Sequence, residues 1–138
     1  EVVLTWTDDQ SDPQFEISSH AWEILAGARD ARGQKLKIHK IHQPGPLFIS
    51  TEESGGFDKV DDAKWRKQGD RLAGSYVNFY MANNGIVMPL FDDPHDMQAI
   101  DAMQKIFPER KIIGVQTREI LLGGGNIHCM TQQQPSSL

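Results

Sequence analysis

Apolar residues occur along the chain in short runs and in helical repeats, separated by polar turns. The first run, Val2 to Trp6, has the length and composition of a buried strand. Asp12-Pro13 then has the residue types favoured at the N-cap and first position of a helix. Apolar residues follow helical spacing until Gly33, which is expected to end the helix, and a short strand follows over residues 36–41. This pattern predicts a β-α-β unit.

The regular pattern is lost between residues 43 and 75. Pro44 to Pro46 predicts a rigid turn, and residues 52–70 are charged and dotted with glycine. A loop of this length inside a domain is usually functional, inserted or poorly ordered. Trp65 is expected either to anchor the loop by packing or to cover a pocket. Four basic residues are expected to be solvated: Lys64, Arg66, Lys67 and Arg71.

Two strands joined by a tight turn are predicted after this loop. They cover residues 76–82 and 86–91, and Asn83-Asn84-Gly85 has the composition of a hairpin turn. At least one turn residue is expected to have a positive φ, most easily Gly85.

A helix and a further strand complete this unit. Asp93 is predicted as the N-cap, with Pro94 at the first helical position, and the amphipathic pattern ends before Pro108. Residues 111–115 then predict a strand. Together with the hairpin, these elements have the order ββαβ.

The chain's only cysteine, Cys129, follows a strand predicted over 119–122 and three glycines, 123–125, and lies on a second short strand. A single thiol cannot form an internal disulfide or a multi-cysteine zinc site, so it is a buried apolar residue, a free surface thiol or a nucleophile. Glycines at this point let a ligand approach the backbone, which favours a nucleophile. Alternatively, the glycines form a bulge and the cysteine fills space. The spacing leaves both interpretations open.

Composition excludes several classes of protein. With 138 residues, 38% of them hydrophobic and 24% charged, the chain is an ordinary single domain rather than a collagen, a low-complexity chain or a disulfide mini-protein. A net charge of −5 without a basic stripe argues against binding to nucleic acid, and the absence of a long apolar run argues against insertion into a membrane. Because Glu1 precedes a strand directly, the chain is expected to begin without a signal peptide or start and to be the C-terminal part of a longer protein.

Several segments resemble agmatine deiminases, within the group that includes the Porphyromonas-type peptidyl-arginine deiminases. They are VVLTWTDD, DARGQKLKIHKIHQPGPLFIS, GDRLAGSYVNFYMANNG, VMPLFDDPHD and TREILLGGGNIHC, in this order. The resemblance implies an α/β fold, a pentein-type propeller of five ββαβ modules, of which this chain supplies about two.

The same resemblance divides the chain, as the C-terminal part of one deiminase domain, into four stretches. Residues 1–42 end one module, 43–75 form the long loop, 76–116 form a ββαβ module and 117–138 close the domain with the nucleophile. It also implies that Cys129 is this nucleophile, and that no metal or other cofactor takes part. The residues implied as a substrate-binding segment are Gly124, Gly125 and Asn126.

The implied reaction is hydrolysis of agmatine to N-carbamoylputrescine and ammonia through a thiouronium on the cysteine, a step of putrescine and polyamine biosynthesis. A peptidyl-arginine or arginine deiminase of the same fold is the first alternative, and a non-catalytic fragment or binding module is the second. The implied partners are the guanidino substrate, the upstream modules of the same protein and a second copy of the protein. The implied compartment is the cytoplasm.

The remaining histidines and acids are expected to be structural. His39 and His42 are expected to point to different sides of a strand, and His20 and His95 to be solvated. His128 is expected to face away from its neighbour Cys129, because successive strand residues alternate. Asp8-Asp9 and Asp92-Asp93 are expected to cap helices rather than bind substrate. The resemblance therefore implies a catalytic histidine and guanidinium-binding carboxylates that precede Glu1.

Overall fold

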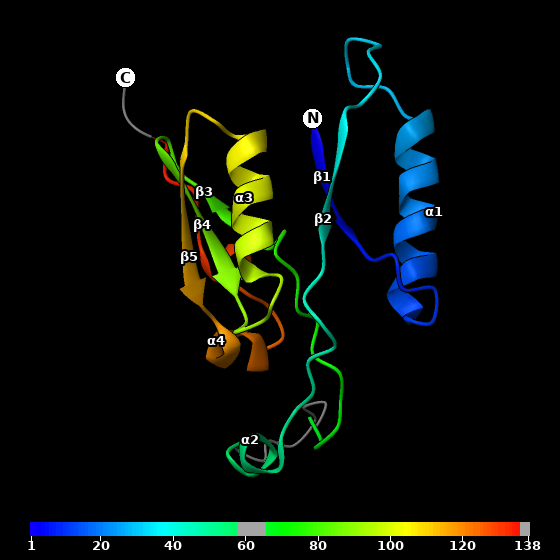
Figure 1. Ribbon diagram of the computed structural model, residues 1–138. Coiled ribbons are helices and arrows are strands. Elements are labelled where there is room, and N and C mark those ends of the chain that lie inside the picture. The colour runs from blue at the N-terminus through cyan, green and yellow to red at the C-terminus, as the bar shows by residue number, and fades with distance from the viewer. Residues whose placement is uncertain (58–65, 136–138) are drawn as a thin grey trace.

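The structure, a computed structural model, describes residues 1–57 and 66–135. These residues form four layers in the order sheet, helix, sheet, helix (Figure 1). The three-stranded sheet β3-β4-β5 is followed by α3, then by the pair β1-β2, and finally by α1. Helix α3 is thus covered by a sheet on each side.

The first unit is a parallel β-α-β unit. It consists of β1 (Val2–Trp6), α1 (Pro13–Gly27) and β2 (Ile38–His42). The two strands are parallel, with Val2 opposite Ile38 and Trp6 opposite His42. The Lys40 ammonium lies over the ring of Trp6, 3.2 Å from its centroid, a cation–π contact across the two strands.

The second unit has the predicted order ββαβ. It consists of β3 (Tyr80–Met81), β4 (Gly85–Leu90), α3 (Asp96–Ile106) and β5 (Lys111–Gln116). β3 is antiparallel to β4, and β4 is parallel to β5. This unit also forms most of the core, where Ile86 and Met88 of β4 and Met103 of α3 are fully buried together with Ile41 of β2.

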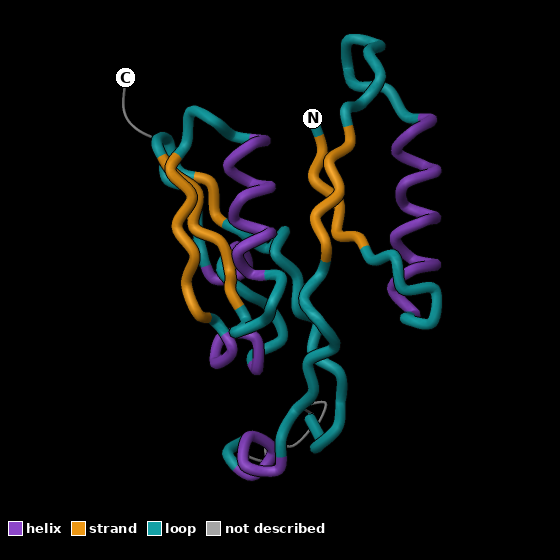
Figure 2. Tube along the Cα trace, viewed as in Figure 1, coloured by secondary structure: helices purple, strands orange, loops and turns teal. Residues whose placement is uncertain are grey.

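The long loop, residues 43–75, has two extended arms that run side by side, and the first of them leads into the short helix α2 (Thr51–Gly55) (Figure 2). Its arms are joined by backbone hydrogen bonds, from the Ile49 N–H to the Asp70 carbonyl and from the Leu72 N–H to the Leu47 carbonyl. Ile49 and Leu72 are buried. The loop is therefore held by its own ladder rather than left as an open coil.

Asp12 ties this loop to the first helix. Its carboxylate caps α1 by accepting the Gln14 N–H, and it also accepts both terminal nitrogens of Arg71 at 2.8 and 2.7 Å. The hydrogen bonds from Arg71 lower the pKa of Asp12 to about 2. The predicted cap is confirmed, but the expectation that Arg71 is simply solvated is wrong. Lys64 and Trp65 lie outside the described residues.

Helix α1 is shorter than the periodicity predicted. It ends at Gly27, and Ala28 is already extended. Asp30 then turns the chain, because its carboxylate accepts the backbone N–H of Arg32 and of Gln34. Gly33 has a φ of 76° and belongs to this turn, not to the end of the helix.

The strand predicted over 76–82 shrinks to Tyr80–Met81. Tyr76 is instead part of the core, where its hydroxyl donates to the Asp96 carboxylate at 2.7 Å. Burial, and then this hydrogen bond, raise the pKa of Tyr76. Asp96 also accepts the Phe91 N–H. A local strand pattern is thus overridden by a buried polar contact between distant residues.

Two predictions about turns are also wrong. In the hairpin turn, none of residues 83–85 has a positive φ. A Cβ on Gly85 would lie 3.2 Å from the Lys111 carbonyl oxygen, so space there is tight. Asp93 is not the cap of α3, which starts at Asp96. Its carboxylate accepts the backbone N–H of His95, the N-cap residue, and also that of Gly45 in the long loop.

The segment 117–130 contains no strand. Residues 118–122 form the helix α4 (Arg118–Leu122), and His128–Met130 forms a 3-10 turn. The Leu121 N–H donates to the Thr117 carbonyl, and Arg, Glu and Leu are strong helix formers. These apolar residues are therefore helical despite their strand-like composition.

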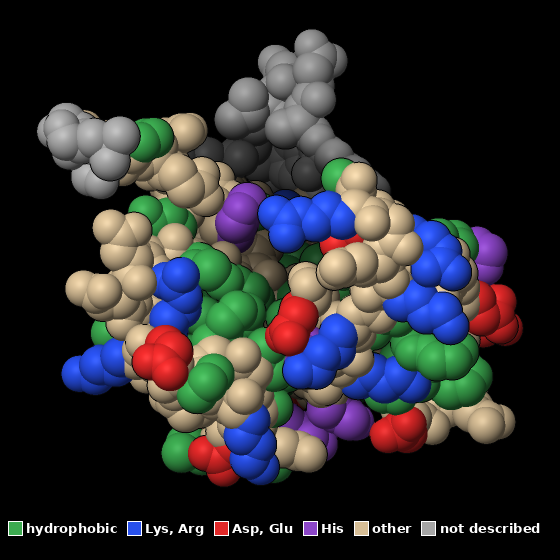
Figure 3. All heavy atoms as spheres, turned by 90° about the horizontal axis from the view of Figure 1, so that it is seen from above, with side chains coloured by type: hydrophobic (Ala, Val, Ile, Leu, Met, Phe, Trp, Pro, Cys, Tyr) green, Lys and Arg blue, Asp and Glu red, His purple; other side chains and the backbone are tan. Residues whose placement is uncertain are grey.

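The surface charge is mixed. On the face shown in Figure 3, basic and acidic side chains are interspersed over the whole surface, with apolar side chains between them. This face carries no basic stripe of the kind that binds nucleic acid. In the described part of the chain, no helix is long and apolar enough to span a membrane.

Candidate active site

Cys129 lies in the 3-10 turn His128–Met130, directly after the glycine segment Gly123–Gly125. The two residues before this turn, Asn126 and Ile127, are buried, with 2% and 6% of their surface exposed. The Asn126 side-chain oxygen accepts the Ile127 N–H, and its backbone carbonyl accepts the Met130 N–H. The thiol itself is exposed to solvent. Buried residues thus present a free, accessible sulfur.

Asn78 contacts this sulfur from a distant part of the chain. Its side-chain oxygen accepts the His128 N–H at 2.9 Å, and its Nδ2 lies 3.3 Å from the Cys129 Sγ. The hydrogen bond from Asn78 lowers the pKa of the Cys129 thiol, and the Asn126 backbone contributes in the same direction. Sequence analysis missed Asn78, because it treated residue 78 only as part of a strand.

The glycine segment makes room for the turn. A Cβ at Gly125 would lie 2.7 Å from the Cys129 Cβ and 2.9 Å from its Sγ. Gly124 has a φ of 96°, and a Cβ there would collide with the Arg66 guanidinium. Close packing against Cys129 therefore favours glycine at residue 125, and the positive φ favours glycine at residue 124. Substrate binding by Gly124, Gly125 and Asn126 stays a prediction, and Asn126 is buried within this chain.

Gly125→Ala is expected to disturb both the fold and the thiol. The new methyl group would overlap the Cys129 side chain, so the protein should lose roughly 1–3 kcal/mol of unfolding free energy. Chemical denaturation and the rate of thiol alkylation measure the two effects. Gly27→Ala is the matched control, because a Cβ there meets no atom within 4 Å. Equal midpoints and equal alkylation rates for the two variants would refute this role of Gly125.

Two histidines that were expected to be separate and solvated lie together. The rings of His42 and His95 are stacked, with centroids 4.4 Å apart and planes 11° apart. The His95 Nδ1 also contacts the Asp93 carboxylate at 2.7 Å. Although burial raises the pKa of Asp93, hydrogen bonds from His95 and Gly45 outweigh it, and the net pKa is lowered. This group joins β2 to the start of α3 and does not contact the thiol.

Among the described residues, no histidine side chain hydrogen-bonds to the Cys129 sulfur. His39 contacts the Glu1 carboxylate at 3.0 Å. His128 is in the 3-10 turn, so the strand alternation used to place it away from Cys129 does not apply. Within residues 1–57 and 66–135, Asn78 is the only residue whose side chain hydrogen-bonds to the Cys129 sulfur.

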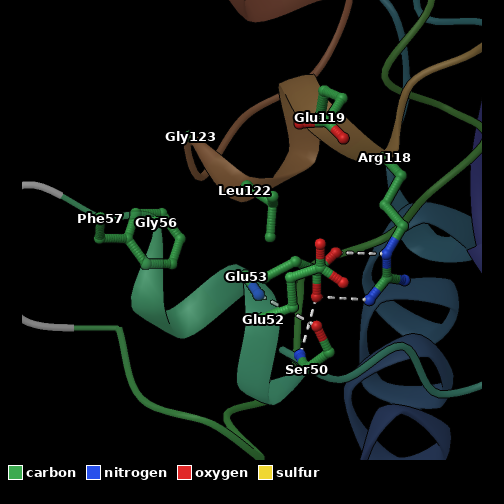
Figure 4. A pocket seen from close by; sticks show the side chains of 9 residues that line it. All are labelled: Ser50, Glu52, Glu53, Gly56, Phe57, Arg118, Glu119, Leu122 and Gly123. Atoms are coloured by element: carbon green, nitrogen blue, oxygen red, sulfur yellow. Dashed lines mark hydrogen bonds and ion pairs between the residues drawn. The ribbon is translucent and has the colours of Figure 1, made fainter.

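A cavity of about 640 Å³ lies between α2 and α4 (Figure 4). Glu53 points across it to Arg118, whose guanidinium donates to both carboxylate oxygens at 2.6 and 2.9 Å. These hydrogen bonds lower the pKa of Glu53 to about 2. Glu53 also accepts the Ser50 N–H in a capping box. The carboxylate is therefore already paired, and Cys129 does not line this cavity.

The described residues place no three His, Cys, Asp or Glu side chains where they could hold a metal ion. The predicted capping role of Asp8-Asp9 is also absent. Asp8 accepts the Trp6 indole N–H, and Asp9 accepts the Ser11 N–H. The chemistry of the described site is that of one activated thiol beside an amide.

Residues 1–135 match the sequence profile of the Porphyromonas-type peptidyl-arginine deiminases. The chain belongs to this family. A Latilactobacillus sakei protein provisionally named agmatine deiminase is 57% identical over 136 residues, which are 99% of this chain and 37% of that protein. The agmatine deiminase of Pseudomonas aeruginosa is 53% identical over the same share of each chain.

The solved structures agree with this placement in the deiminase family. The agmatine deiminase of Enterococcus faecalis, described as catalysing its reaction, is 38% identical and superposes with a TM-score of 0.89. The match covers 96% of this chain and 36% of that one. The implied fold class, a part of a pentein-type α/β propeller, is thereby confirmed. The chain spans little more than a third of the length of the relatives it matches.

Proposed function

We propose that this chain is the C-terminal portion of an agmatine deiminase and provides its nucleophile, Cys129. The observation that carries the proposal is the exposed thiol with a lowered pKa, held in a family segment whose glycines leave room for it. The names of relatives that are 53–57% identical support agmatine as the substrate. In this proposal the protein works in putrescine and polyamine biosynthesis in the cytoplasm.

The proposed reaction proceeds in two covalent steps. The Cys129 thiolate attacks the guanidinium carbon, an S–C bond forms, and the C–N bond to a terminal amino group breaks as that group takes a proton and leaves as ammonia. Water then adds to the carbon of the thiouronium, the S–C bond breaks, and N-carbamoylputrescine and the free thiol result. Splitting the hydrolysis in this way helps because a guanidinium carbon is a poor electrophile. The general base and the carboxylates that pair with the guanidinium come from residues preceding Glu1.

In this proposal, the upstream modules of the same protein pack against the apolar surface that this chain leaves exposed. Ile113 and Val115 lie two residues apart on β5, so they share one sheet face, and they are 43% and 41% exposed. Ile17 and Ile24, seven residues apart on α1, are 61% and 59% exposed. Apolar patches of this kind mark interfaces. A second copy of the protein is the other proposed partner.

Two other functions remain as alternatives. The family name itself points to peptidyl-arginine, and free arginine is a further candidate. Arginine and peptidyl-arginine carry a carboxylate or a peptide group on the carbon where agmatine has only hydrogen. The second alternative is a non-catalytic fragment or binding module. The fit of Cys129 between Gly125 and Asn78 argues against it, because a site without chemistry has no need of an exposed thiol with a lowered pKa.

The substrate is tested by measuring ammonia release from three guanidino compounds by the full-length protein that contains this chain. We expect kcat/KM for agmatine to exceed that for arginine and for an arginine peptide by at least roughly a hundredfold, because a charged or bulky group that lacks a partner in a closed site costs several kcal/mol. Turnover of the peptide at a comparable rate would replace agmatine with peptidyl-arginine. No release from any of the three would support the non-catalytic alternative.

A further inference from the structure

We propose that Asn78 is the positioning residue of the nucleophile: its side-chain carbonyl holds the Cys129 turn, and its NH2 group stabilises the sulfur as a thiolate. The inference rests on the proposed function, in which Cys129 attacks the substrate. It concerns a residue 51 positions away from the cysteine in sequence. The argument depends on the orientation of the amide, on which protonation state of sulfur it favours, and on how firmly Asn78 is held.

The orientation of the Asn78 amide is fixed by its neighbour. The His128 backbone N–H can only donate, and it points at the Asn78 Oδ1 from 2.9 Å. Rotating the amide by half a turn would place two donors against each other. The carbonyl oxygen must therefore face His128, and the NH2 group must face the sulfur.

This orientation favours the thiolate over the thiol. A thiolate accepts a hydrogen bond from Nδ2 at 3.3 Å. A neutral thiol can donate to Oδ1, but that contact is longer, 3.7 Å, and Oδ1 also accepts the much shorter hydrogen bond from the His128 N–H at 2.9 Å. Hydrogen bonding to the charged form favours that form. The lowered pKa of Cys129 has Asn78 as its largest cause.

The backbone around Asn78 is anchored on both sides. Tyr76, two residues before it, is 1% exposed and bound to Asp96. Phe79, the next residue, packs edge-on against Phe107 with centroids 6.3 Å apart. The Asn78 carbonyl also accepts the His128 N–H, at 3.2 Å. A side chain held this firmly needs little reordering when the thiolate forms, which is the requirement for a preorganised site.

Among the described residues, no cationic side chain hydrogen-bonds to the Cys129 sulfur. The other ionisable groups of this region are His128, next to the cysteine, and Arg66, whose guanidinium lies against Gly124. Neither hydrogen-bonds to the Cys129 Sγ within the described residues. Reactive cysteines usually depend on such a cation or on a helix N-terminus. Here a neutral amide takes that place, so the thiol should respond strongly to a charge at residue 78.

The test is the pH dependence of alkylation of Cys129 by iodoacetamide in the full-length protein, followed by mass spectrometry of the peptide that contains Cys129. Asn78→Asp keeps an oxygen for the His128 N–H but replaces the NH2 donor with a negative charge. We expect its alkylation profile to move to higher pH and its rate at neutral pH to fall about tenfold or more, one pKa unit corresponding to a factor of ten. Asn83→Asp, the same change in an exposed turn, is the matched control and should leave the profile in place.

A second variant, Asn78→Ala, separates the loss of the hydrogen-bond donor from the effect of an added charge. Asn78→Ala removes the donor without adding charge, so its profile should shift in the same direction by a smaller amount, and circular dichroism should show whether each variant keeps its fold. Superimposable profiles for the parent, the folded Asn78 variants and Asn83→Asp would overturn the inference. Agmatine turnover, measured on the parent full-length protein, distinguishes a failure of this inference from a failure of the proposed function. A shifted profile with no agmatine turnover in the parent would uphold the role of Asn78 at the thiol and reject the deiminase.

Discussion

Cys129→Ser is expected to abolish ammonia release from agmatine by the full-length protein, lowering kcat by roughly a thousandfold or more. Serine has nearly the same shape and can still receive a hydrogen bond from Asn78, so the turn should remain intact. Its hydroxyl, however, stays protonated at neutral pH without a strong base beside it, and it is a far weaker nucleophile than a thiolate. The loss would therefore be chemical, not structural.

Steady-state kinetics and thermal unfolding of the Cys129→Ser protein measure these two effects separately. Met130→Ala is a suitable control: Met130 is the next residue of the same turn, and it is 65% exposed. It should keep both activity and fold. Turnover of Cys129→Ser close to that of the parent would remove Cys129 from the nucleophile role. Loss of activity together with a lowered unfolding temperature would attribute the effect to the fold instead.

The sequence predicted the elements whose hydrophobic pattern is decided locally. β1, β2, β4, β5 and the two long helices all lie where their periodicity placed them, within a few residues at the ends. Asp12 was predicted as a cap for the same reason, because its first partner, the Gln14 N–H, is two residues away. Patterns of this kind report contacts that each segment makes with one neighbouring layer.

The predictions failed where a polar side chain has a distant partner. Tyr76 leaves the predicted strand because its hydroxyl binds Asp96, and Asp93 binds Gly45 of the long loop in addition to the nearby His95 N–H. Neither distant partner can be found from spacing. The helix α4 and the 3-10 turn after it failed for another reason: short apolar runs fit a strand and a helix equally well.

The candidate site shows the same division. Resemblance to the family implied that Cys129 is the nucleophile, whereas the glycines before it left that role and a space-filling role both open. Asn78 was invisible to both approaches, because its role depends on the contact between a loop residue and a turn that folding brings together. Gly125 was noticed as a glycine that exposes backbone to a ligand. The structure gives it a different task, which is to clear space for the cysteine side chain.

Three carboxylates of this chain are paired with internal basic side chains. Asp12 accepts both terminal nitrogens of Arg71, Glu53 pairs with Arg118, and Asp93 holds His95. The hydrogen bonds from these partners lower the pKa of all three acids. A cationic substrate would have to displace an internal partner to reach any of them. These three acids are therefore not free to pair with the substrate's charge.

We accordingly expect the isolated 138-residue chain to release no ammonia from agmatine above the rate of its Cys129→Ser variant. The sulfur has only Asn78 as a side-chain hydrogen-bond partner among the described residues, and an amide cannot act as a general base. Catalytic groups that act together are strongly non-additive, so a missing base and missing carboxylates should leave almost no turnover. The exposed Ile113 and Val115 should also make the chain self-associate in size-exclusion chromatography.

Adding the upstream segment of the full-length protein as a separate chain should restore activity. In this experiment the upstream segment supplies the base and the carboxylates, and docking covers the exposed apolar faces, so monodispersity and thiol-dependent ammonia release should return together. The upstream segment mixed with the Cys129→Ser chain is the control and should stay inactive. Robust ammonia release by the parent 138-residue chain alone, absent in its serine variant, would contradict the prediction. It would require a base within the chain, and His128, the neighbour of Cys129 in the 3-10 turn, would be the first residue to replace.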